Sequence, residues 1–295
     1  SAASDVYKRQ GIDRVSALAR RVSESPLWEK GFRIWILGMT AQWMGVMGDH
    51  ANSVAPLLIS TEQGYFKSTF CKSLLPPVLR RYYMDKVDLT SQGNVERRLA
   101  EMGLLNLDEF DKFSPAKMPL LKNLMQMASL SLCKAYQKNY RALPRIASFI
   151  GTSNRKDLLT DPTGSRRFMC VELEHPIDCE AIDHEQIYTQ LKAEILSGKR
   201  YWFTKEEERE LQENNMKFYR QGPVEDVLRA CYRSAERREE CDLLSAADIF
   251  QCLKRRNPAA MRGANPASLA QILVAVGIER KHTKFGNVYR VVKIG

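Results

Sequence analysis

The sequence predicts an α/β protein with a mostly parallel, helix-covered sheet, followed by a smaller C-terminal module. The first observation is that short apolar runs typical of buried strands alternate with segments of helical spacing between residues 53 and 219. The second is a change of pattern after 221–223, where helical segments lead to two β-like runs. We therefore expect two domains, residues 11–222 and 223–295.

The first domain is expected to begin with a buried helix over 25–45, which Ser25 can cap and Pro26 can start. Its strands are expected in the apolar runs at 53–60, 103–110, 145–154 and 165–173. Further helices are expected within 67–83, where the Pro76–Pro77 pair would end the helix, and over 114–132, 183–200 and 204–219. The last of these carries the capping-box pair Thr204 and Glu207.

In the second domain, helices are expected over 224–236, 245–256 and 265–278. The final run, 279–294, contains two β-like segments around Gly286 and Asn287, where a hairpin turn is expected. Helix, turn, helix and hairpin is the order of a winged-helix domain. Between 245 and 295, nine Lys and Arg residues stand against two acidic ones, so this module is strongly basic.

The composition favours a globular protein that binds a polyanion. The 295 residues are 44% hydrophobic, which is ample for a sizeable core, and the formal charge is +10 with a pI near 9.2. A membrane surface is an alternative partner, but no basic amphipathic helix of the interfacial kind is evident and the apolar runs are too short to span a bilayer. Nucleic acid is therefore the first partner to consider.

The cysteines and the N-terminus bear on the compartment. The seven cysteines are scattered without a Cys-x-x-Cys pair, so neither a zinc site nor a disulfide framework is indicated, and the four histidines are not metal candidates. No secretory signal is evident, which favours a cytoplasmic protein of a bacterium or phage. We interpret the first ten residues, SAASDVYKRQ, as a non-native leader, which would make the chain part of a longer protein.

One stretch, STEQGYFKSTF at 60–70, nearly spells a phosphate-binding P-loop. In such a loop, backbone amides wrap a phosphate, the lysine reaches the outer phosphates and the next hydroxyl binds Mg²⁺. The corresponding residues here are Gln63, Gly64, Lys67, Ser68 and Thr69. Thr61 and Phe66 stand where glycines are usual, and a left-handed Phe66 would cost about 1–2 kcal/mol. The alternative is an ordinary strand-to-helix connection with a surface lysine.

Two acids end the next predicted strand, in LLNLDEFDKF at 104–113. Asp108 would bind Mg²⁺ through water, and Glu109 would orient or deprotonate the attacking water, as in a Walker B element. The alternative is a strand that simply ends in acids. That alternative does not predict their place on the next strand after Lys67.

Two weaker signals follow. FIGTSN at 149–154 ends a strand with polar residues, of which Asn154 would contact the γ-phosphate or the water, with Thr152 and Ser153 as lesser candidates. DPTGSRRF at 161–168 presents Arg166 and Arg167 after a turn, where they would stabilise the transferring phosphoryl group of a neighbouring subunit. The alternatives are a turn-forming Asn and two surface arginines.

In their order and spacing, EQGYFKSTF, LLNLDEFDKF, FIGTSN and DPTGSRRF resemble the motifs of the virulence-associated E (VapE-like) proteins, over roughly residues 30–175. Those proteins resemble superfamily 3 helicases and the phage and poxvirus primase-helicases. The resemblance implies an AAA+-like P-loop ATPase that uses ATP and Mg²⁺, forms a homo-oligomeric ring, often a hexamer, and follows a primase-like domain. The implied roles are Walker A for Lys67 and Ser68, Walker B for Asp108 and Glu109, sensor for Asn154, and arginine finger for Arg166 or Arg167.

The resemblance also implies a hairpin that projects into the ring channel, within CKAYQKNYRALPR at 133–145. Cations that hold the backbone and rings that stack on bases suit single-stranded DNA, and this segment offers Lys134, Tyr136, Lys138 and Arg141. In the C-terminal module the charges lie around Arg255, Arg256, Lys281 and Lys284, which favours contact with the DNA backbone over base reading. The alternatives are a surface hairpin with packed tyrosines and a basic module that packs on the ATPase.

The sequence therefore predicts an ATP-dependent helicase or translocase that acts on single-stranded or forked DNA in the replication of a phage or mobile element. The competing hypothesis is a non-enzymatic DNA-binding assembly factor with a degenerate P-loop, which Phe66 favours. A small-molecule P-loop kinase would not need the terminal basic module.

Overall fold

The computed structural model describes residues 12–89, 92–133, 140–160, 165–219, 222–236, 238–284 and 286–294. The chain divides into two compact units, Ser1–Tyr219 and Arg220–Gly295, close to the boundary expected at residue 222. The first unit has two buried apolar clusters and the second has one of its own. The expected leader, residues 1–10, lies outside the described residues.

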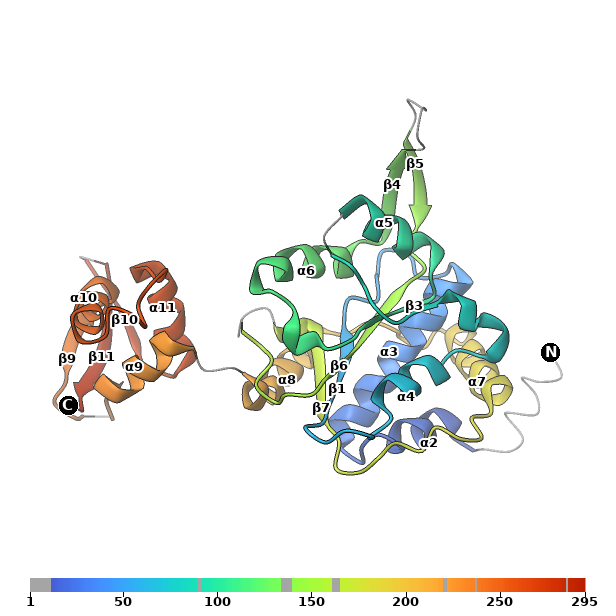
Figure 1. The fold of residues 1–295 in the computed structure, drawn as a ribbon, viewed down its shortest axis with the longest axis horizontal. Helices are drawn as coiled ribbons and strands as arrows, with labels where there is room; N and C mark the ends of the chain where they lie inside the picture. Colours follow the sequence, from blue (N-terminus) through green and yellow to red (C-terminus); the bar gives the residue numbers. More distant parts are fainter. Residues whose placement is uncertain are drawn as a thin grey trace. The chain divides into compact units, whose positions relative to one another are not determined.

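The first unit is built on a five-stranded parallel sheet with the order β2-β3-β6-β1-β7 (Figure 1). Its strands are β1 Ala55–Ile59, β2 Tyr83–Met84, β3 Leu104–Leu107, β6 Ser148–Ser153 and β7 Phe168–Glu172. The predicted α/β fold with a mostly parallel sheet is confirmed. Because β6 lies between β1 and β3, the carboxyl ends of the three strands that lead into the predicted motifs are neighbours.

Helices cover both faces of this sheet. They are α2 Arg14–Arg20, α3 Pro26–Met44, α4 Lys67–Ser73, α5 Gln92–Glu101, α6 Met118–Gln126, α7 His184–Leu196 and α8 Lys205–Asn215. Successive side chains of a strand point to opposite faces, so Leu58 packs into one apolar cluster while Leu57 and Ile59 pack into the other. None of the helices in the described ranges has the length and apolar character that a membrane span requires.

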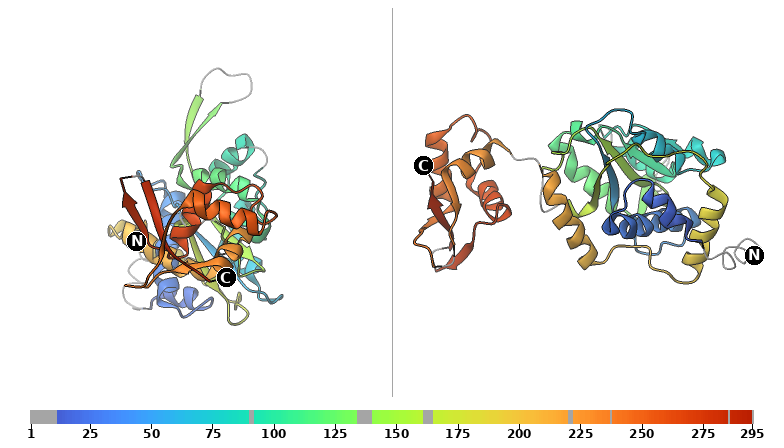
Figure 2. Two further views of the ribbon diagram at one scale, coloured as in Figure 1. Left: turned by 90° about the vertical axis from the view of Figure 1, so that its left-hand side faces the viewer. Right: turned by 90° about the horizontal axis from the view of Figure 1, so that it is seen from below.

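The helix expected over 114–132 is wrong in its second half. A 3-10 turn at Pro115–Lys117 and α6 are followed by β4 Ser129–Cys133, which pairs antiparallel with β5 Tyr140–Pro144. The polar–apolar alternation of SLSLC is a strand pattern, and it prevails over helical spacing once the chain leaves α6. The β4–β5 hairpin projects from the first unit (Figures 1 and 2).

A buried arginine fixes the base of this hairpin. The Arg145 guanidinium donates hydrogen bonds to the carbonyls of Leu124 and Met125 at the end of α6, and to those of Asn52 and Ala147. Burial lowers the pKa of Arg145 to about 9. The same side chain therefore closes α6, holds the hairpin base and contacts the segment that leads into β6.

Several other bounds differ from the expected ones. The helix that starts at Lys67 was expected to end at the Pro76–Pro77 pair, and α4 ends at Ser73, just before that pair. A 3-10 turn at Pro77–Tyr82 and β2 follow it. Neither β2 nor α5 was expected. The helix α5 is largely polar and buries only Val95 and Leu99 among its apolar residues, so it gives little periodic signal. Further 3-10 turns lie at Phe110–Lys112, Ser165–Arg167 and Met216–Phe218.

The second unit combines three helices with short antiparallel strands. Its elements are α9 Pro223–Cys231, β8 Tyr232–Ser234, β9 Asp242–Ser245, α10 Ala246–Arg256, α11 Pro266–Ala275, β10 Arg280–Thr283 and β11 Gly286–Lys293. β11 pairs with β10, β8 and β9. The helix expected over 224–236 therefore ends early, where β8 begins. The order of α10, α11 and the β10–β11 hairpin agrees with the expected one, and the winged-helix assignment stays a prediction.

Candidate nucleotide-binding site

The loop between β1 and α4 contains two residues with a left-handed backbone. Gly64 has φ 79° and Phe66, immediately before α4, has φ 58°. A left-handed residue next to a right-handed one turns successive N–H groups toward one point, a geometry that holds phosphate. Phe66 adopts this conformation at a strain of about 1–2 kcal/mol, and the residue is 54% exposed. Gln63 and Gly64 are exposed in the loop, and Thr69 is exposed in the first turn of α4.

Lys67, the first residue of α4, contacts the ends of two strands. Its Nζ donates to the Ser60 carbonyl oxygen at 2.9 Å and to Asn154 Oδ1 at 3.0 Å. Partial burial lowers the pKa of Lys67, while the negative charges of Asp111 and Asp108 oppose that shift. Both present acceptors are uncharged, so charged phosphate oxygens would bind this ammonium more strongly.

Ser68, Asp108 and Thr152 form a second group of contacts at the same sheet edge. Asp108 Oδ1 accepts from Ser68 Oγ at 3.2 Å and from Thr152 Oγ1 at 2.7 Å. Mg²⁺ binds through one or two carboxylates and completes its shell with phosphate oxygens and water. Ser68 and Asp108 fit that donor set. Among the residues described by the structure, no three His, Cys, Asp or Glu side chains gather into a protein-only metal site.

Glu109 differs from the other predicted residues because its side chain is engaged elsewhere. Its backbone is left-handed, with φ 52°, and its N–H donates to Thr152 Oγ1 at 3.3 Å. The carboxylate accepts from Lys112 Nζ at 2.6 Å. Asp108 and Glu109 line a cavity of about 320 Å³, together with Lys86, Lys112 and Lys117 among others. Glu109 therefore lines the cavity, but its carboxylate is paired with Lys112.

One acid in this site was missed by the sequence reasoning. Asp111 Oδ1 accepts hydrogen bonds from Ser153 Oγ at 2.9 Å and from the Asn154 N–H at 3.3 Å. The signal was present as a third acid in LLNLDEFDKF, three residues after Asp108. The position of Asp111 could not be predicted because the chain leaves β3 in a 3-10 turn that sequence spacing does not reveal.

The two arginines lie away from this group. The 3-10 turn that contains Arg166 and Arg167 precedes β7, whose first residue, Phe168, is paired with Ala55 at the start of β1. Lys67 follows the other end of β1, so the length of that strand, roughly 13 Å, separates the two sheet edges. Arg166 Nε lies 3.6 Å from a Glu208 carboxylate oxygen on α8.

The predicted DNA-binding residues fall into two sets. Lys134, Tyr136 and Lys138 lie outside the described residues, and Arg141 is in β5, opposite Leu132 of β4. In the second unit, Arg255 and Arg256 are exposed in the last turn of α10, while Lys281 in β10 and Lys284 just after it are also exposed.

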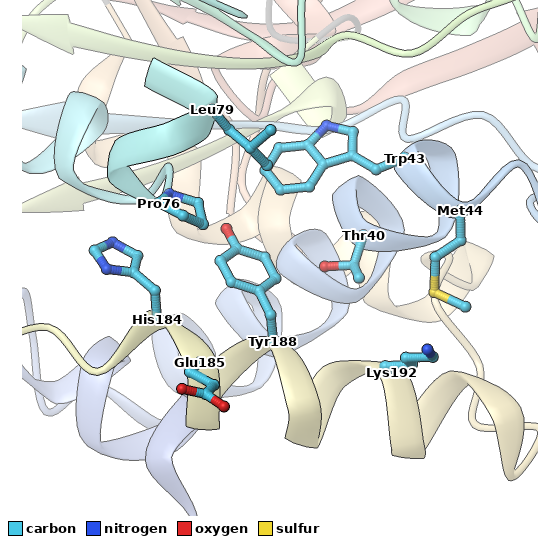
Figure 3. Close-up of a pocket in the computed structure, with 9 residues that line it drawn as sticks. All are labelled: Thr40, Trp43, Met44, Pro76, Leu79, His184, Glu185, Tyr188 and Lys192. Carbon is cyan, nitrogen blue, oxygen red and sulfur yellow. The ribbon is translucent and has the colours of Figure 1, made fainter. Parts of the chain in front are cut away.

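A larger cavity, of about 480 Å³, lies between α3, α7 and the segment after α4 (Figure 3). Three of its polar lining side chains are engaged in the fold: Trp43 Nε1 donates to the Gly103 carbonyl, Tyr188 OH donates to the Leu74 carbonyl, and His184 Nε2 lies 2.7 Å from the Ser73 carbonyl oxygen. These contacts place it at the C-terminal end of α4, whereas Lys67 is at the N-terminal end. We therefore do not assign it to the candidate site.

The fold and the site define an α/β protein with cationic, hydroxyl, carboxylate and amide groups gathered at the carboxyl edge of a parallel sheet. The family model of the virulence-associated protein E-like domain matches residues 5–220, and the chain belongs to that family. Residues 221–291 match a domain of unknown function described from B. Theta, DUF3874.

Solved structures similar to this chain include apo forms of the NrS-1 C-terminal region. Three of them are 14%, 15% and 14% identical in sequence, with TM-scores of 0.43, 0.47 and 0.44. In each case the match covers 96% of this chain and 75% of the other. A search of curated proteins gave no match.

Proposed function

We propose that this chain is an ATP-dependent DNA helicase or translocase that requires Mg²⁺. The observation that carries the proposal is the meeting of Lys67, Ser68, Asp108 and Asn154 at one sheet edge, joined by hydrogen bonds of 3.0 and 3.2 Å. These residues come from three separate motifs. An ordinary strand-to-helix connection with a surface lysine would not bring them together.

The roles follow from the chemistry of each side chain. Lys67 would exchange the Ser60 and Asn154 oxygens for phosphate oxygens, and Ser68 and Asp108 would hold the cation, directly or through water. Bound Mg²⁺ would neutralise the charge that develops on the phosphoryl group supplied by ATP. Glu109, once free of Lys112, accepts a proton from water, and Asn154 orients the γ-phosphate or that water. Gln63, Gly64 and Thr69 complete the loop around the phosphates.

The arginines imply more than one subunit. Arg166 and Arg167 precede β7 at the amino edge of the sheet, away from their own Lys67. A neighbour in a homo-oligomeric ring, which we propose to be a hexamer, would receive one of them as an arginine finger.

DNA would be held by two surfaces. The projecting β4–β5 hairpin, with Lys134, Tyr136, Lys138 and Arg141, would track a single strand. The C-terminal winged-helix domain, residues 223–295, would contact the backbone through Arg255, Arg256, Lys281 and Lys284. We place the protein in the replication of a phage or mobile element in the bacterial cytoplasm, downstream of a primase-like domain.

A second function is favoured by two specific observations. Phe66 strains the loop, and Glu109 is paired with Lys112 at 2.6 Å. Both would slow hydrolysis, as expected of a DNA-binding assembly factor that binds nucleotide without turning it over.

An ATPase assay with and without single-stranded DNA separates the two functions. The helicase is expected to show Mg²⁺-dependent hydrolysis that DNA stimulates, because the hairpin and the site belong to one unit. A negligible rate that DNA leaves unchanged would refute the helicase and favour the assembly factor.

A further inference from the structure

A third carboxylate in the loop after β3 takes no part in the roles above. Asp111 lies in the 3-10 turn Phe110–Lys112. Phe110 anchors that turn in the core: it is buried, and its ring packs against those of Phe113 and Phe168, with centroids 5.7 and 4.9 Å apart. The anchored turn holds Asp111 beside the tip of β6.

Asp111 is tied to that tip by two hydrogen bonds to one oxygen. Oδ1 accepts from Ser153 Oγ at 2.9 Å and from the Asn154 N–H at 3.3 Å. Ser153 is buried, and its hydroxyl also lies 2.8 Å from the Arg155 carbonyl oxygen. A charged carboxylate is the stronger acceptor of the two, so it governs where the hydroxyl points.

Asn154 therefore makes one contact through its backbone and another through its side chain. Its backbone N–H is bound by Asp111, while its side-chain oxygen accepts from Lys67 Nζ at 3.0 Å. The β3 and β6 strands are paired in parallel, so a rigid link between the turns after them fixes the sheet edge on which the site is built.

We propose that Asp111 is a positioning residue: its carboxylate fixes the Ser153–Asn154 tip of β6, and thereby the Asn154 amide that faces Lys67. The proposal rests on the ATPase function proposed above. Asp111 acts through Asn154.

Two substitutions separate hydrogen bonding from charge. Asn at this position can still accept both hydrogen bonds but carries no charge, whereas Ala can do neither. Since a misplacement of about 1 Å can reduce a rate by on the order of 10², we expect Asp111→Ala to lower kcat at least about tenfold with ATP affinity kept within about twofold. Asp111→Asn should retain most of the activity. Wild-type kcat in Asp111→Ala, or an Asp111→Asn variant as slow as Asp111→Ala, would overturn the proposal.

The matched control is Asp157→Ala. Asp157 is a half-buried residue whose carboxylate pairs with Arg155, just beyond the same tip, at 2.7 Å. It is expected to leave kcat unchanged. If Asp157→Ala lowers kcat as much as Asp111→Ala does, the effect comes from the overall negative charge near the tip of β6, and the proposal fails.

A double substitution tests whether Asp111 acts through Asn154. If it does, Asp111→Ala combined with Asn154→Ala should be no slower than Asn154→Ala alone, because residues that act as a unit are not additive. If the two substitutions lower kcat by factors that multiply in the double variant, Asp111 and Asn154 have independent roles and the proposal is overturned.

A readout without hydrolysis distinguishes this inference from the proposed function. Hydrogen exchange of the Asn154 N–H should be at least about tenfold faster in Asp111→Ala and remain protected in Asp111→Asn, because that N–H bonds to Oδ1. Unchanged exchange in Asp111→Ala, in a variant that keeps the wild-type melting temperature, would refute the positioning role alone. A wild-type chain that does not hydrolyse ATP would refute the ATPase alone.

Discussion

Lys67 and Glu109 lie in the same site but would act on different atoms, one on phosphate and the other on water. We expect Lys67→Ala to weaken the binding of a fluorescent ATP analogue at least about tenfold, roughly 1.4 kcal/mol. Glu109→Gln should bind with wild-type affinity and turn over about 10²–10⁴ times more slowly. Lys72→Ala, an exposed lysine later in α4, is the control. Equal loss of affinity in both site variants would contradict the assignment.

Phe66 offers a test of strain at a single residue. Its φ of 58° is one that glycine adopts freely, so Phe66→Gly is expected to relieve about 1–2 kcal/mol. Thermal unfolding should show no loss of stability, and ATP hydrolysis should be unchanged or faster. Loss of nucleotide binding in this variant would mean that the Phe66 ring is a working part of the pocket.

At the residue scale, the sequence predicted the members of the site better than their contacts. Lys67, Ser68, Asp108 and Asn154 were named from motifs, and hydrogen bonds join them in pairs. The pairing of Glu109 with Lys112 was not predicted, and neither was the bond from Asp111 to Asn154. Both depend on the left-handed turn at Glu109, which redirects the chain after β3 and has no signature in residue type.

At the scale of elements, α8 is stabilised by a buried acid. Burial alone would raise the pKa of Glu207, but hydrogen bonds from Arg200 at 2.6 and 2.7 Å and from the Thr204 N–H at 2.9 Å outweigh it and lower the pKa to about 2. The resulting stabilisation is present above the unfolded pKa near 4.5 and is lost as pH falls toward 2.

Glu207→Gln should therefore lower the free energy of unfolding of the first unit near pH 7, measured by urea unfolding. The difference from wild type should shrink as pH falls from 4.5 toward 2, because the wild-type carboxylate is then protonated. Glu213→Gln, an exposed acid on the same helix, is the control. A difference that does not change with pH would indicate that the ion pair contributes nothing.

The elements that sequence reasoning found are those whose pattern matches their burial. β1 is buried at every position and reads as a continuous apolar run, and the Thr204–Glu207 capping box forms as predicted. The segment 129–132 was expected to continue a helix because the preceding apolar residues have helical spacing. The end of α6 is held by the buried Arg145, which lies 20 residues after Met125 in the sequence and whose partners are carbonyls that no pattern reveals.

At the scale of the whole molecule, the basic second unit is expected to bind additional DNA phosphates. Deleting residues 223–295 should weaken DNA binding and flatten its dependence on salt, by about 0.7–0.9 in the log–log slope for each phosphate that the protein no longer neutralises. Substituting Arg255 and Arg256 by Ala in the full chain should change the slope in the same direction by less. An unchanged slope in both proteins would favour a packing role for this unit over DNA binding.

The arginines make a prediction about assembly. Arg166 and Arg167 precede the start of β7 while Lys67 follows the end of β1, so within one subunit they lie at opposite edges of the sheet. An arginine suits the task because its planar fork grips phosphate oxygens in a fixed geometry. Such a finger is worth roughly 10³–10⁵ in rate. Arg166→Ala or Arg167→Ala should therefore bind ATP normally and barely hydrolyse it, unlike the control Arg20→Ala, whose side chain pairs with Glu29 on the surface.

Whether the arginine acts between subunits can be tested by mixing two inactive variants. A mixture of Lys67→Ala with the inactive arginine variant contains interfaces at which one subunit supplies an intact lysine and its neighbour an intact arginine. Hydrolysis should therefore return in the mixture, in proportion to the fraction of such interfaces, although each protein alone is inactive. Co-assembly is checked by pulling down one tagged variant with the other. If the two proteins co-assemble and no hydrolysis returns, the arginine acts within its own subunit and the proposed ring geometry is wrong.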